Sequence, residues 1–547
     1  MTNKEFADLL LPNVEHDWQY YESLYPARNL EKGAMVTRFA PSPTGFVHMG
    51  SLYTSFAALQ LAHQTHGICY LRIEDTDGKR TVENGIKGII NDFKNLNINF
   101  DEGCGFGGNY GPYVQSERKD IYQAYAKKLI EENLAYPCFC SSEELNDIRN
   151  YQEHKKLRIG YYKKYAKCRD LSKDEAVNKI KNGESFIIRF RSQGNFDNKI
   201  ILHDAIKGDI EMPENDIDDV IIKSDGLPTY HFAHVIDDHL MHTTHVTRGD
   251  EWISSYPKHH ELFKLLNFEE PVYAHIAPIT IKENNTIRKL SKRKDKEAAI
   301  SYYHKLGIPT EVIRLYLATI ENYDFEEWYT NNPTLGINDF KFEFSKMPIG
   351  GTLFDIEKLL SISKIYFSRM KNTELYERLL NYTKEYDEEF YNILINNKEY
   401  ALNVLNIERD IPRPRKDIAS LSDVRKEFWY MFNELFDNNN DLYEDVKICD
   451  KNIIINYINN IYDINDNEDV WFTKVKEYAC NNGYTADKKA FKENPDKYIG
   501  MVATFCALLR VIICKKNMSP NIYYLIKYLG KEELIKRTEL FYKKINN

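Results

Sequence analysis

The segment between residues 35 and 50 constrains the fold of this chain more than any other. Its first six residues, Met-Val-Thr-Arg-Phe-Ala, form a short apolar run that predicts a strand. Pro41, Pro43 and Gly45 then force the chain into a loop. From His48 onward apolar residues recur at helical spacing. We therefore expect a strand, a tight loop and a helix in that order.

This loop would deliver His48 and Gly50 to the first turn of the helix. A helix N-terminus presents free N–H groups and the positive end of its dipole, which favours phosphate. Gly50 would let a flat ligand approach the backbone, and His48 can donate hydrogen bonds to phosphate oxygens as charge builds on them. The alternative for His48 is an ordinary surface-loop histidine. The segment predicts a nucleotide site, although the pattern H-x-G alone is a weak signal.

A second segment, Lys289-Leu-Ser-Lys-Arg293, lies far downstream, and the pair resembles the signature motifs of class I aminoacyl-tRNA synthetases. Further segments make the chain similar to the glutamyl-tRNA synthetase family: LRIEDTD from Leu71, GPYVQSER from Gly111, KSDGLPTYH from Lys223 and VIDDHLM from Val235. They occur in the family's order, and the resemblance covers about residues 35–370. The glutaminyl relatives carry a Pro-Pro-Glu-Pro-Asn type of run, which this chain lacks.

The resemblance implies a Rossmann-like α/β catalytic domain with an α+β insertion, followed by an all-helical region that contacts the tRNA stem and anticodon. The expected divisions are an N-terminal extension at 1–34, the first half of the catalytic domain at 35–110, an inserted acceptor-binding domain at 111–215, the second catalytic half at 216–285, a KMSKS-type loop and stem-contact domain at 286–371, and a helical anticodon-binding region at 372–547. We expect the extension to be an ordered strap and Val220–Lys223 to return to the parallel sheet. The ligand should lie at the topological switch between the two halves.

Composition sets outer limits on this interpretation. A chain of 547 residues is too long for one core and predicts three to five domains. The net charge of −9 argues against non-specific polyanion binding, so a tRNA site needs local basic patches. The 9 cysteines are scattered and no export signal is visible, which favours reduced thiols and a cytoplasmic protein. No run looks apolar enough to span a membrane, and a monomer is the default expectation.

The resemblance implies a two-step reaction that uses ATP with Mg²⁺. Glutamate attacks the α-phosphate to give glutamyl-adenylate, and the terminal ribose hydroxyl of tRNA(Glu) then takes the glutamyl group. It assigns this chemistry to His48, Gly50, Lys289, Ser291, Lys292 and Arg293. Lys292 is our first choice to stabilise the leaving pyrophosphate, as a point charge on a flexible stem. The alternative for this basic run is a solvated charged loop.

Recognition of glutamate needs cations for two carboxylates and an acceptor for the ammonium group. The family-equivalent positions are Arg38, Ala40, Ser42, Glu74, Tyr230, His234, Arg248 and Glu251. Arg38 is our candidate for the side-chain carboxylate, with Arg248 in reserve. Glu74 would bind the ammonium group, or form a salt bridge with Arg72 or Arg80 instead.

The roles of His234 and Trp252 stay open. His234 stands where several relatives carry asparagine. Trp252 would flank the nucleoside of ATP, or would simply belong to the core.

A zinc site is predicted in the insertion from Cys138, Cys140 and Cys168. The C-x-C spacing brings two thiolates to one side of a turn, within reach of one tetrahedral Zn²⁺. The family pattern adds a tyrosine, for which Tyr165 is our choice, with Tyr161 and Tyr162 open. The alternative is a set of reduced core cysteines.

Three rival functions are weaker. A glutamyl-queuosine-type paralogue, which modifies a tRNA base, resembles the catalytic half only, and the long helical C-terminal region disfavours it. A plain nucleotidyltransferase would not need the glutamate-site segments. A binding-only tRNA paralogue would carry damaged motifs, whereas His48, Gly50, Lys289 and Lys292 are intact.

Overall fold

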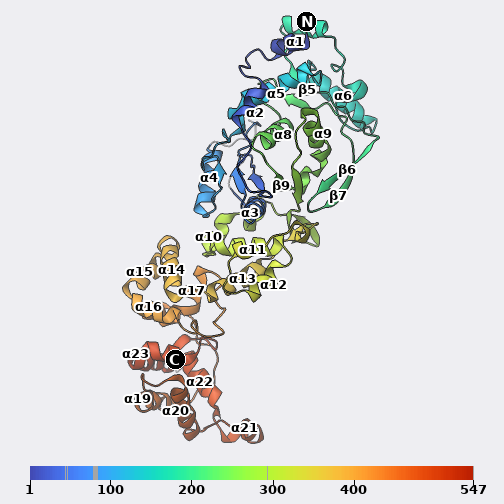
Figure 1. The fold of residues 1–547 in the computed structure, drawn as a ribbon. Coiled ribbons are helices and arrows are strands. Elements are labelled where there is room, and N and C mark those ends of the chain that lie inside the picture. The colour runs from blue at the N-terminus through green and yellow to red at the C-terminus, as the bar shows by residue number, and fades with distance from the viewer. Residues whose placement is uncertain (44, 46, 78–83, 292, 546–547) are drawn as a thin grey trace. The chain divides into compact units, whose positions relative to one another are not determined.

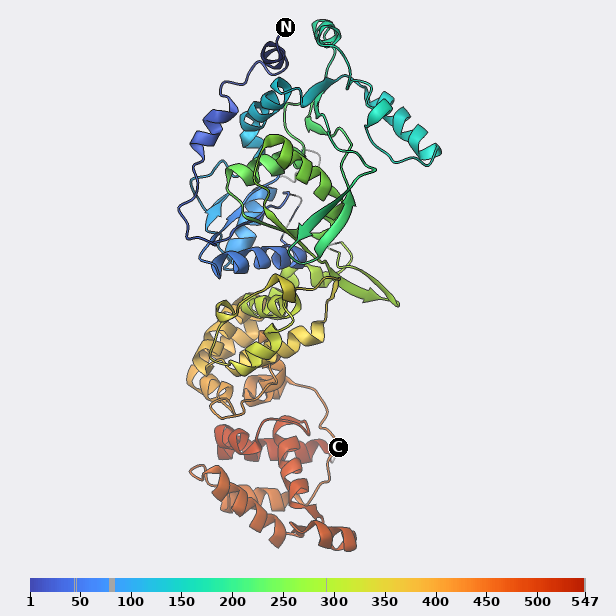
Figure 2. The ribbon, with the colours of Figure 1, turned by 45° about the vertical axis from the view of Figure 1, so that its right-hand side comes forward.

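The computed structural model of the chain describes residues 1–43, 45, 47–77, 84–291 and 293–545 (Figure 1). It divides into two compact units. The first comprises Met1–Ile300 and Arg314–Phe354, and the second comprises Ser301–Ile313 and Asp355–Asn547. Strands and helices alternate in the first unit, whereas the second is almost wholly helical (Figure 2).

The first half of the predicted parallel sheet is confirmed. It consists of β1 (Val36–Phe39), β2 (Ile68–Leu71) and β3 (Glu102–Gly103), in that spatial order. All pairs are parallel. Helix α3 (Met49–His63) connects β1 to β2 and packs against both strands. Most of α3 is buried, which explains the apolar residues on nearly every side of it.

The second half of the sheet runs β9 (His245–Gly249), β10 (Val272–Ile276), β6 (Lys199–Asp204) and β7 (Gly208–Pro213). β10 is parallel to both β9 and β6, and β7 is antiparallel to β6. The two halves meet where β9 lies beside β1, since the Thr244 amide donates to the Val36 carbonyl at 2.9 Å. Strand order reverses there, so β1 and β9 flank the predicted switch point.

The insertion forms a separate antiparallel sheet of β4 (Ala135–Cys138), β5 (Ile187–Phe190) and β8 (Val220–Ile222). Three helices, α5 (Lys119–Glu131), α6 (Ser142–His154) and α7 (Lys173–Lys181), accompany it. The prediction that Val220–Lys223 returns to the parallel sheet is wrong, because Ile222 pairs with Ile188 of β5. A short apolar run does not reveal which sheet it joins. Conversely β6, inside the range predicted as insertion, pairs with β10.

Residues 1–34 are an ordered strap, as predicted. Helices α1 (Asn3–Leu10) and α2 (Trp18–Leu24) both pack against α5. Thr2 and Glu5 form a reciprocal capping box at the start of α1. Arg28 then pairs with Glu102 at 2.9 Å. The strap therefore shares the core of the parallel sheet.

The remaining elements of the first unit surround the sheet or extend from it. They are α4 (Gly85–Asn95), α8 (Tyr230–Leu240), α9 (Tyr256–Leu266), β11 (Ile279–Glu283), β12 (Thr286–Lys289), α12 (Phe325–Asn331) and β13 (Thr352–Leu353). Both α10 (Ile300–Leu306) and α11 (Thr310–Glu321) contribute residues to each unit.

The second unit is built from helices around one apolar core. The helices are α13 (Ile356–Ser368), α14 (Asn372–Tyr386), α15 (Glu388–Asn396), α16 (Lys398–Leu405), α17 (Leu421–Phe428), α18 (Asn433–Asn438), α19 (Lys451–Asn460), α20 (Glu468–Asn481), α21 (Lys488–Glu493), α22 (Val502–Cys514) and α23 (Ile522–Ile545), with a short parallel pair, β14 (Tyr484–Thr485) and β15 (Gly500–Met501). Gly530, at φ +75°, interrupts α23. Within the described ranges, no helix combines the length and apolarity needed to cross a membrane.

Candidate active site

The strand–loop–helix prediction for the first motif is confirmed. β1 ends at Phe39, and α3 begins at Met49 with His48 as its N-cap. The Nδ1 atom of His48 accepts from the Ser51 amide at 3.2 Å, so the ring caps the helix. A Cβ on Gly50 would lie 3.0 Å from the His48 ring, so glycine leaves room for that side chain. Two loop positions, Thr44 and Phe46, lie outside the described residues.

The second motif follows a tight hairpin. β11 and β12 pair antiparallel, and Asn284 and Asn285 both have positive φ, as a two-residue turn requires. Lys289 ends β12 and pairs with Glu251 at 3.0 Å on the surface.

The loop after Lys289 is closed by one ion pair. Arg288 meets both carboxylate oxygens of Asp295 at 2.7 Å, and the Ser291 amide donates to Asp295 at 2.7 Å. The pKa of Asp295 falls to about 2 because Arg288 hydrogen-bonds to it. Arg293 donates its amide to Ser291 at 3.4 Å, whereas Lys292 lies outside the described residues.

The two motifs approach one another in the first unit. His48 forms an isolated antiparallel bridge with Ala299, just beyond the basic segment. This bridge joins the start of α3 to the segment that follows the second motif.

Three arginines, Arg38, Arg72 and Arg248, lie buried near the C-terminal ends of β1, β2 and β9. Arg72 is fully enclosed and donates to Asp238 at 2.6 Å and to Glu74 at 3.1 Å. The predicted alternative of a salt bridge to Glu74 is therefore formed by Arg72, while Arg80 lies outside the described residues. Burial raises the pKa of Glu74, although Arg72 and Arg38 oppose that shift.

Arg38 has one carboxylate neighbour. Its Nε lies 3.4 Å from Asp238, and Nη1 donates to the Thr247 carbonyl at 3.2 Å. No described residue accepts a hydrogen bond from its Nη2. Ala40 and the exposed Ser42 follow on the same loop, and the Glu74 amide donates to the Pro41 carbonyl at 3.0 Å. Arg38 and Glu74 thus border the first motif.

Arg248 has no carboxylate neighbour within salt-bridge distance among the described residues. Its Nε donates to His275 Nε2 at 2.9 Å, and Nη1 donates to His259 Nδ1 at 3.0 Å. The Tyr273 ring centre lies 4.5 Å from its guanidinium carbon. Its Nη2 makes only a long contact of 3.5 Å with the Trp252 carbonyl. A buried charge that lacks an ionic partner is uncommon and marks a candidate binding site.

Aromatic rings enclose this part of the unit. Tyr230 lies 4.4 Å from Trp252 and stacks on His234, with ring centres 5.7 Å apart. His234 approaches Asp238 at 2.8 Å and Tyr273 at 2.9 Å. Burial lowers the pKa of His234 to about 4, although Asp238 acts in the opposite direction. His234 is therefore neutral near pH 7.

Sequence reasoning missed Asp238, His259 and His275. Asp238 follows His234 by four residues on an apolar helix, which could have indicated a shared face. His275 occurs among apolar residues of a buried strand, and His259 stands between Lys258 and His260, so neither pattern indicates a site. Only their convergence on Arg248 distinguishes them.

The predicted cysteines do converge in the insertion. The possible ligand atoms of Cys138, Cys140 and Cys168 all lie within 4.8 Å of one another. The Tyr161 hydroxyl lies 3.4 Å from Cys138 Sγ and 3.3 Å from Cys140 Sγ. Tyr165 instead packs against Tyr151 and Tyr162. The choice of Tyr165 is therefore corrected to Tyr161, since sequence spacing did not show which ring the turn directs inward.

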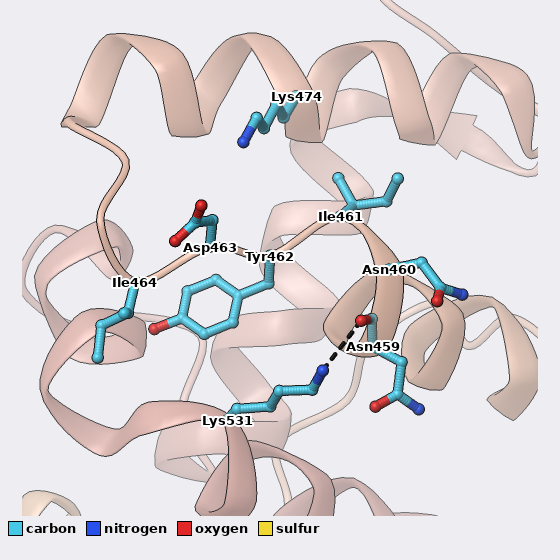
Figure 3. A pocket seen from close by; sticks show the side chains of 8 residues that line it. All are labelled: Asn459, Asn460, Ile461, Tyr462, Asp463, Ile464, Lys474 and Lys531. Carbon is cyan, nitrogen blue, oxygen red and sulfur yellow. Dashed lines mark hydrogen bonds between the residues drawn. The ribbon is translucent and has the colours of Figure 1, made fainter.

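A hollow of about 420 Å³ opens in the second unit (Figure 3). Its lining residues are Asn459, Asn460, Ile461, Tyr462, Asp463, Ile464, Lys474 and Lys531. Lys531 donates to the Asn459 carbonyl at 2.9 Å, and Lys474 pairs with Asp466 at 2.7 Å. None of the predicted site residues lines this hollow.

Comparisons with known proteins show which proteins this chain resembles. Residues 34–323 match the family "tRNA synthetases class I (E and Q), catalytic domain". The chain is 44% identical to the glutamate–tRNA ligase of Clostridium perfringens (strain 13 / Type A), over 98% of this chain and 100% of that protein. It is equally similar to that of Acetivibrio thermocellus, with the same coverage.

A solved structure resembles the chain along most of its length. The glutamate tRNA ligase from Elizabethkingia meningosepticum, solved in complex with its amino acid, superposes with a TM-score of 0.74 at 25% identity. The match covers 93% of this chain and 99% of that chain. The similarity thus includes the helical second unit as well as the sheet.

Proposed function

The chain belongs to the glutamate–tRNA ligase family of class I tRNA synthetases, and we propose how its residues perform that family's reaction on tRNA(Glu). The enzyme joins L-glutamate to the 3′ end of the tRNA by way of glutamyl-adenylate, with ATP and Mg²⁺ as the substrate complex. Neither step requires a covalent enzyme intermediate. Positioning and charge stabilisation therefore carry the catalysis.

The observation that carries the proposal is the buried, carboxylate-free guanidinium of Arg248. Glutamate offers two carboxylates, and we assign one to Arg248 and the other to Arg38. Arg248 gains more from an incoming carboxylate because no carboxylate of the described residues contacts it. Glu74 binds the substrate ammonium, and Tyr230 and His234 line the site beside them.

The nucleotide side of the site uses the two motifs. His48 and Gly50 lie at the N-terminus of α3, where phosphate is favoured. Lys289 and Lys292 stabilise the leaving pyrophosphate, together with Ser291 and Arg293. Trp252 flanks the nucleoside, and Glu251, which now pairs with Lys289, contacts the substrate when that lysine moves.

Aminoacylation tests the activity directly. Purified enzyme is given labelled glutamate or glutamine with tRNA(Glu) or tRNA(Gln), ATP and Mg²⁺. We expect glutamate to be attached to tRNA(Glu). Folded enzyme that charges no glutamate-accepting tRNA from its own organism would contradict the proposal. We propose further that the enzyme acts as a cytoplasmic monomer, and we assign the helical second unit to the anticodon arm.

We further propose one structural Zn²⁺ held by Cys138, Cys140, Cys168 and the Tyr161 hydroxyl. Three thiols whose sulfur atoms lie within 4.8 Å of one another, with a phenol beside two of them, are a donor set suited to tetrahedral zinc. All nine cysteines are free, so thiolates are available. The ion would fix the turn that carries Tyr161 against β4.

Elemental analysis of enzyme purified without chelator should give about one zinc per chain. Cys168→Ser should lose the metal, and Tyr161→Phe should release it to a chelator faster than the matched control Tyr165→Phe. Equal stability of metal-free wild type with and without chelator would leave the cysteines as a reduced core.

A further inference from the structure

Asp204 fixes the tautomer of the histidine on one side of Arg248. Asp204 Oδ2 lies 2.6 Å from His275 Nδ1 and also accepts from the His275 amide at 3.1 Å. Its Oδ1 accepts from the amides of Ile206 and Lys207 at 3.0 and 2.8 Å. Burial raises the pKa of Asp204, but these hydrogen bonds outweigh that effect and keep it below its usual value. An ionised Asp204 requires the proton on His275 Nδ1, so the Nε2 lone pair faces Arg248.

A second histidine pair acts on the other side. His259 Nδ1 accepts from Arg248, so its proton must sit on Nε2, which lies 2.9 Å from His231 Nδ1. Burial lowers the pKa of His259 well below its ordinary value and that of His231 to about 3. His275 and His259 therefore accept on the side toward Arg248 and donate on the side away from it, to Asp204 and His231 respectively.

The consequence is a directed chain of hydrogen bonds across five elements, β6, β10, β9, α9 and α8. Its only carboxylate, Asp204, is separated from Arg248 by a whole imidazole ring. The guanidinium is thus held in place at Nε and Nη1, while no carboxylate in the described part of the chain contacts its charge. Among these residues its Nη2 has the long contact with the Trp252 carbonyl and no other hydrogen bond.

We propose that Asp204, His275, His259 and His231 are positioning residues that hold Arg248 through imidazole lone pairs and so keep its positive charge uncompensated for a glutamate carboxylate. This inference deepens the proposed function and rests on it. A carboxylate in the place of either imidazole would hold the arginine equally well. It would also compete with the substrate for the same charge.

Two nearly isosteric variants distinguish the hydrogen bond that positions Arg248 from the effect of a negative charge beside it. In His259→Asn the amide oxygen can occupy the position of Nδ1 and accept from Arg248. His259→Asp places an oxygen in the same position and adds a negative charge. We expect KM for glutamate to rise by no more than about 3-fold in His259→Asn and by about 30-fold or more in His259→Asp. The kcat and the KM for ATP should stay within about 2-fold of wild type in both.

A matched control comes from the next residue on α9. His260 pairs with Glu270 at 2.7 Å and does not contact Arg248, so His260→Asn should leave KM for glutamate unchanged. Equal KM values in folded His259→Asn and His259→Asp would overturn the inference.

Arg248→Ala, measured in parallel, separates this failure from failure of the proposed function. If Arg248→Ala leaves KM for glutamate unchanged, the assignment of Arg248 itself fails. If Arg248→Ala abolishes glutamate use but the two His259 variants behave alike, only the uncompensated-charge inference fails.

Should His259→Asp not fold, Asp204→Asn provides the second test. Its amide can donate to His275 Nδ1, which moves the ring proton to Nε2 and sets an N–H against Arg248. KM for glutamate should rise about 10-fold with kcat unchanged. Adding His275→Gln, whose oxygen can accept at the Nε2 position, should restore KM. An unchanged KM in folded Asp204→Asn would overturn the role of the relay.

Discussion

Arg72 and Arg248 are both buried in the first unit, but their surroundings differ in charge. Arg72 lies 2.6 Å from Asp238 and 3.1 Å from Glu74. Arg248 contacts neutral imidazoles, an aromatic ring and a carbonyl. A buried ion pair holds local structure, and removing one partner is costly. A buried charge with no ionic partner weakens the fold and is retained for a ligand.

Arg38 falls between these two cases. It has one carboxylate neighbour, Asp238, at 3.4 Å, and that carboxylate also serves Arg72. The Arg72–Asp238 ion pair thus also holds Arg38 in place through the shared carboxylate. The comparison predicts that removing Arg72 costs stability, that removing Arg248 costs substrate binding, and that removing Arg38 costs some of both.

The largest effect is expected on the choice between glutamate and glutamine. A guanidinium aimed at the side-chain carboxylate meets an amide NH₂ in glutamine, donor against donor, and such mismatches reject an analogue by up to ~10⁴-fold. Arg38→Ala and Arg248→Ala should both raise KM for glutamate, and the one that reads the side chain should also collapse the glutamate-to-glutamine ratio. Aminoacylation with both amino acids measures this.

The result assigns the side-chain carboxylate to one arginine. Collapse in Arg38→Ala supports the assignment made from the sequence, and collapse in Arg248→Ala moves it to the unpaired arginine. Arg38→Lys should restore function only in part, since a point charge cannot reproduce the fork. If neither alanine variant changes the ratio, specificity by charge is wrong.

Next in size is the effect of Arg72→Met on stability. It removes the cation that Asp238 and Glu74 share and leaves two buried carboxylates without it. We expect a loss of about 3–5 kcal/mol in the free energy of unfolding. Chemical denaturation measures this, and Arg248→Met is the matched control. The control should lose less than about 1 kcal/mol, since it removes a buried charge without stranding another. Similar losses of unfolding free energy in Arg72→Met and Arg248→Met would contradict the proposed difference between the two arginines.

Lys292→Ala should affect neither the surroundings of Arg72 nor those of Arg248 directly. As a charge that acts mainly on the transition state, Lys292 should contribute about 10²-fold or more to kcat and little to ATP binding. KM for glutamate and the unfolding free energy should stay at wild-type values. A rise in KM for ATP with kcat unchanged would make Lys292 a ground-state binder instead.

Local patterns predicted the segment from β1 to α3 well. Proline and glycine force the loop, and apolar spacing places the helix, so both features depend on neighbours in sequence. The first half of the parallel sheet was likewise predictable from alternating strands and helices, whereas β6 of the second half lies in the range predicted as insertion. Arg38 accordingly lies on the expected strand and His48 at the start of the expected helix.

Contacts between distant segments could not be predicted in the same way. The run Val220–Lys223 is apolar enough for either sheet, and only packing assigns it to β5. Tyr161 and Tyr165 differ by a turn whose direction no spacing reveals. The surroundings of Arg248 come from β6, β10 and α9, which lie far apart in sequence.

The smallest expected effect is a difference in the pH dependence of stability between the surroundings of Arg248 and those of Arg72. Burial lowers the folded pKa of His231 to about 3 and of His234 to about 4, while an unfolded histidine titrates near 6.5. Below pH 6.5 the unfolded chain therefore binds protons that the folded chain refuses, and stability falls as pH decreases toward 4. Each such histidine contributes about 1.4 kcal/mol per pH unit.

The folded pKa of Asp238 is held well below 3.8 because Arg72 and Arg38 outweigh its burial, so the carboxylate-paired region loses its stabilisation only below about that pH. The free energy of unfolding, measured from pH 7 to pH 4, should show the loss that the histidines cause. His259→Asn should reduce the slope of that loss by the contribution of one histidine, about 1.4 kcal/mol per pH unit. His260→Asn should leave the slope below about pH 5.5 unchanged, since Glu270 raises the pKa of His260 and both states are protonated there. A slope that His259→Asn does not change would mean that His259 is charged in the folded enzyme, and Arg248 would then face a cation instead of a lone pair.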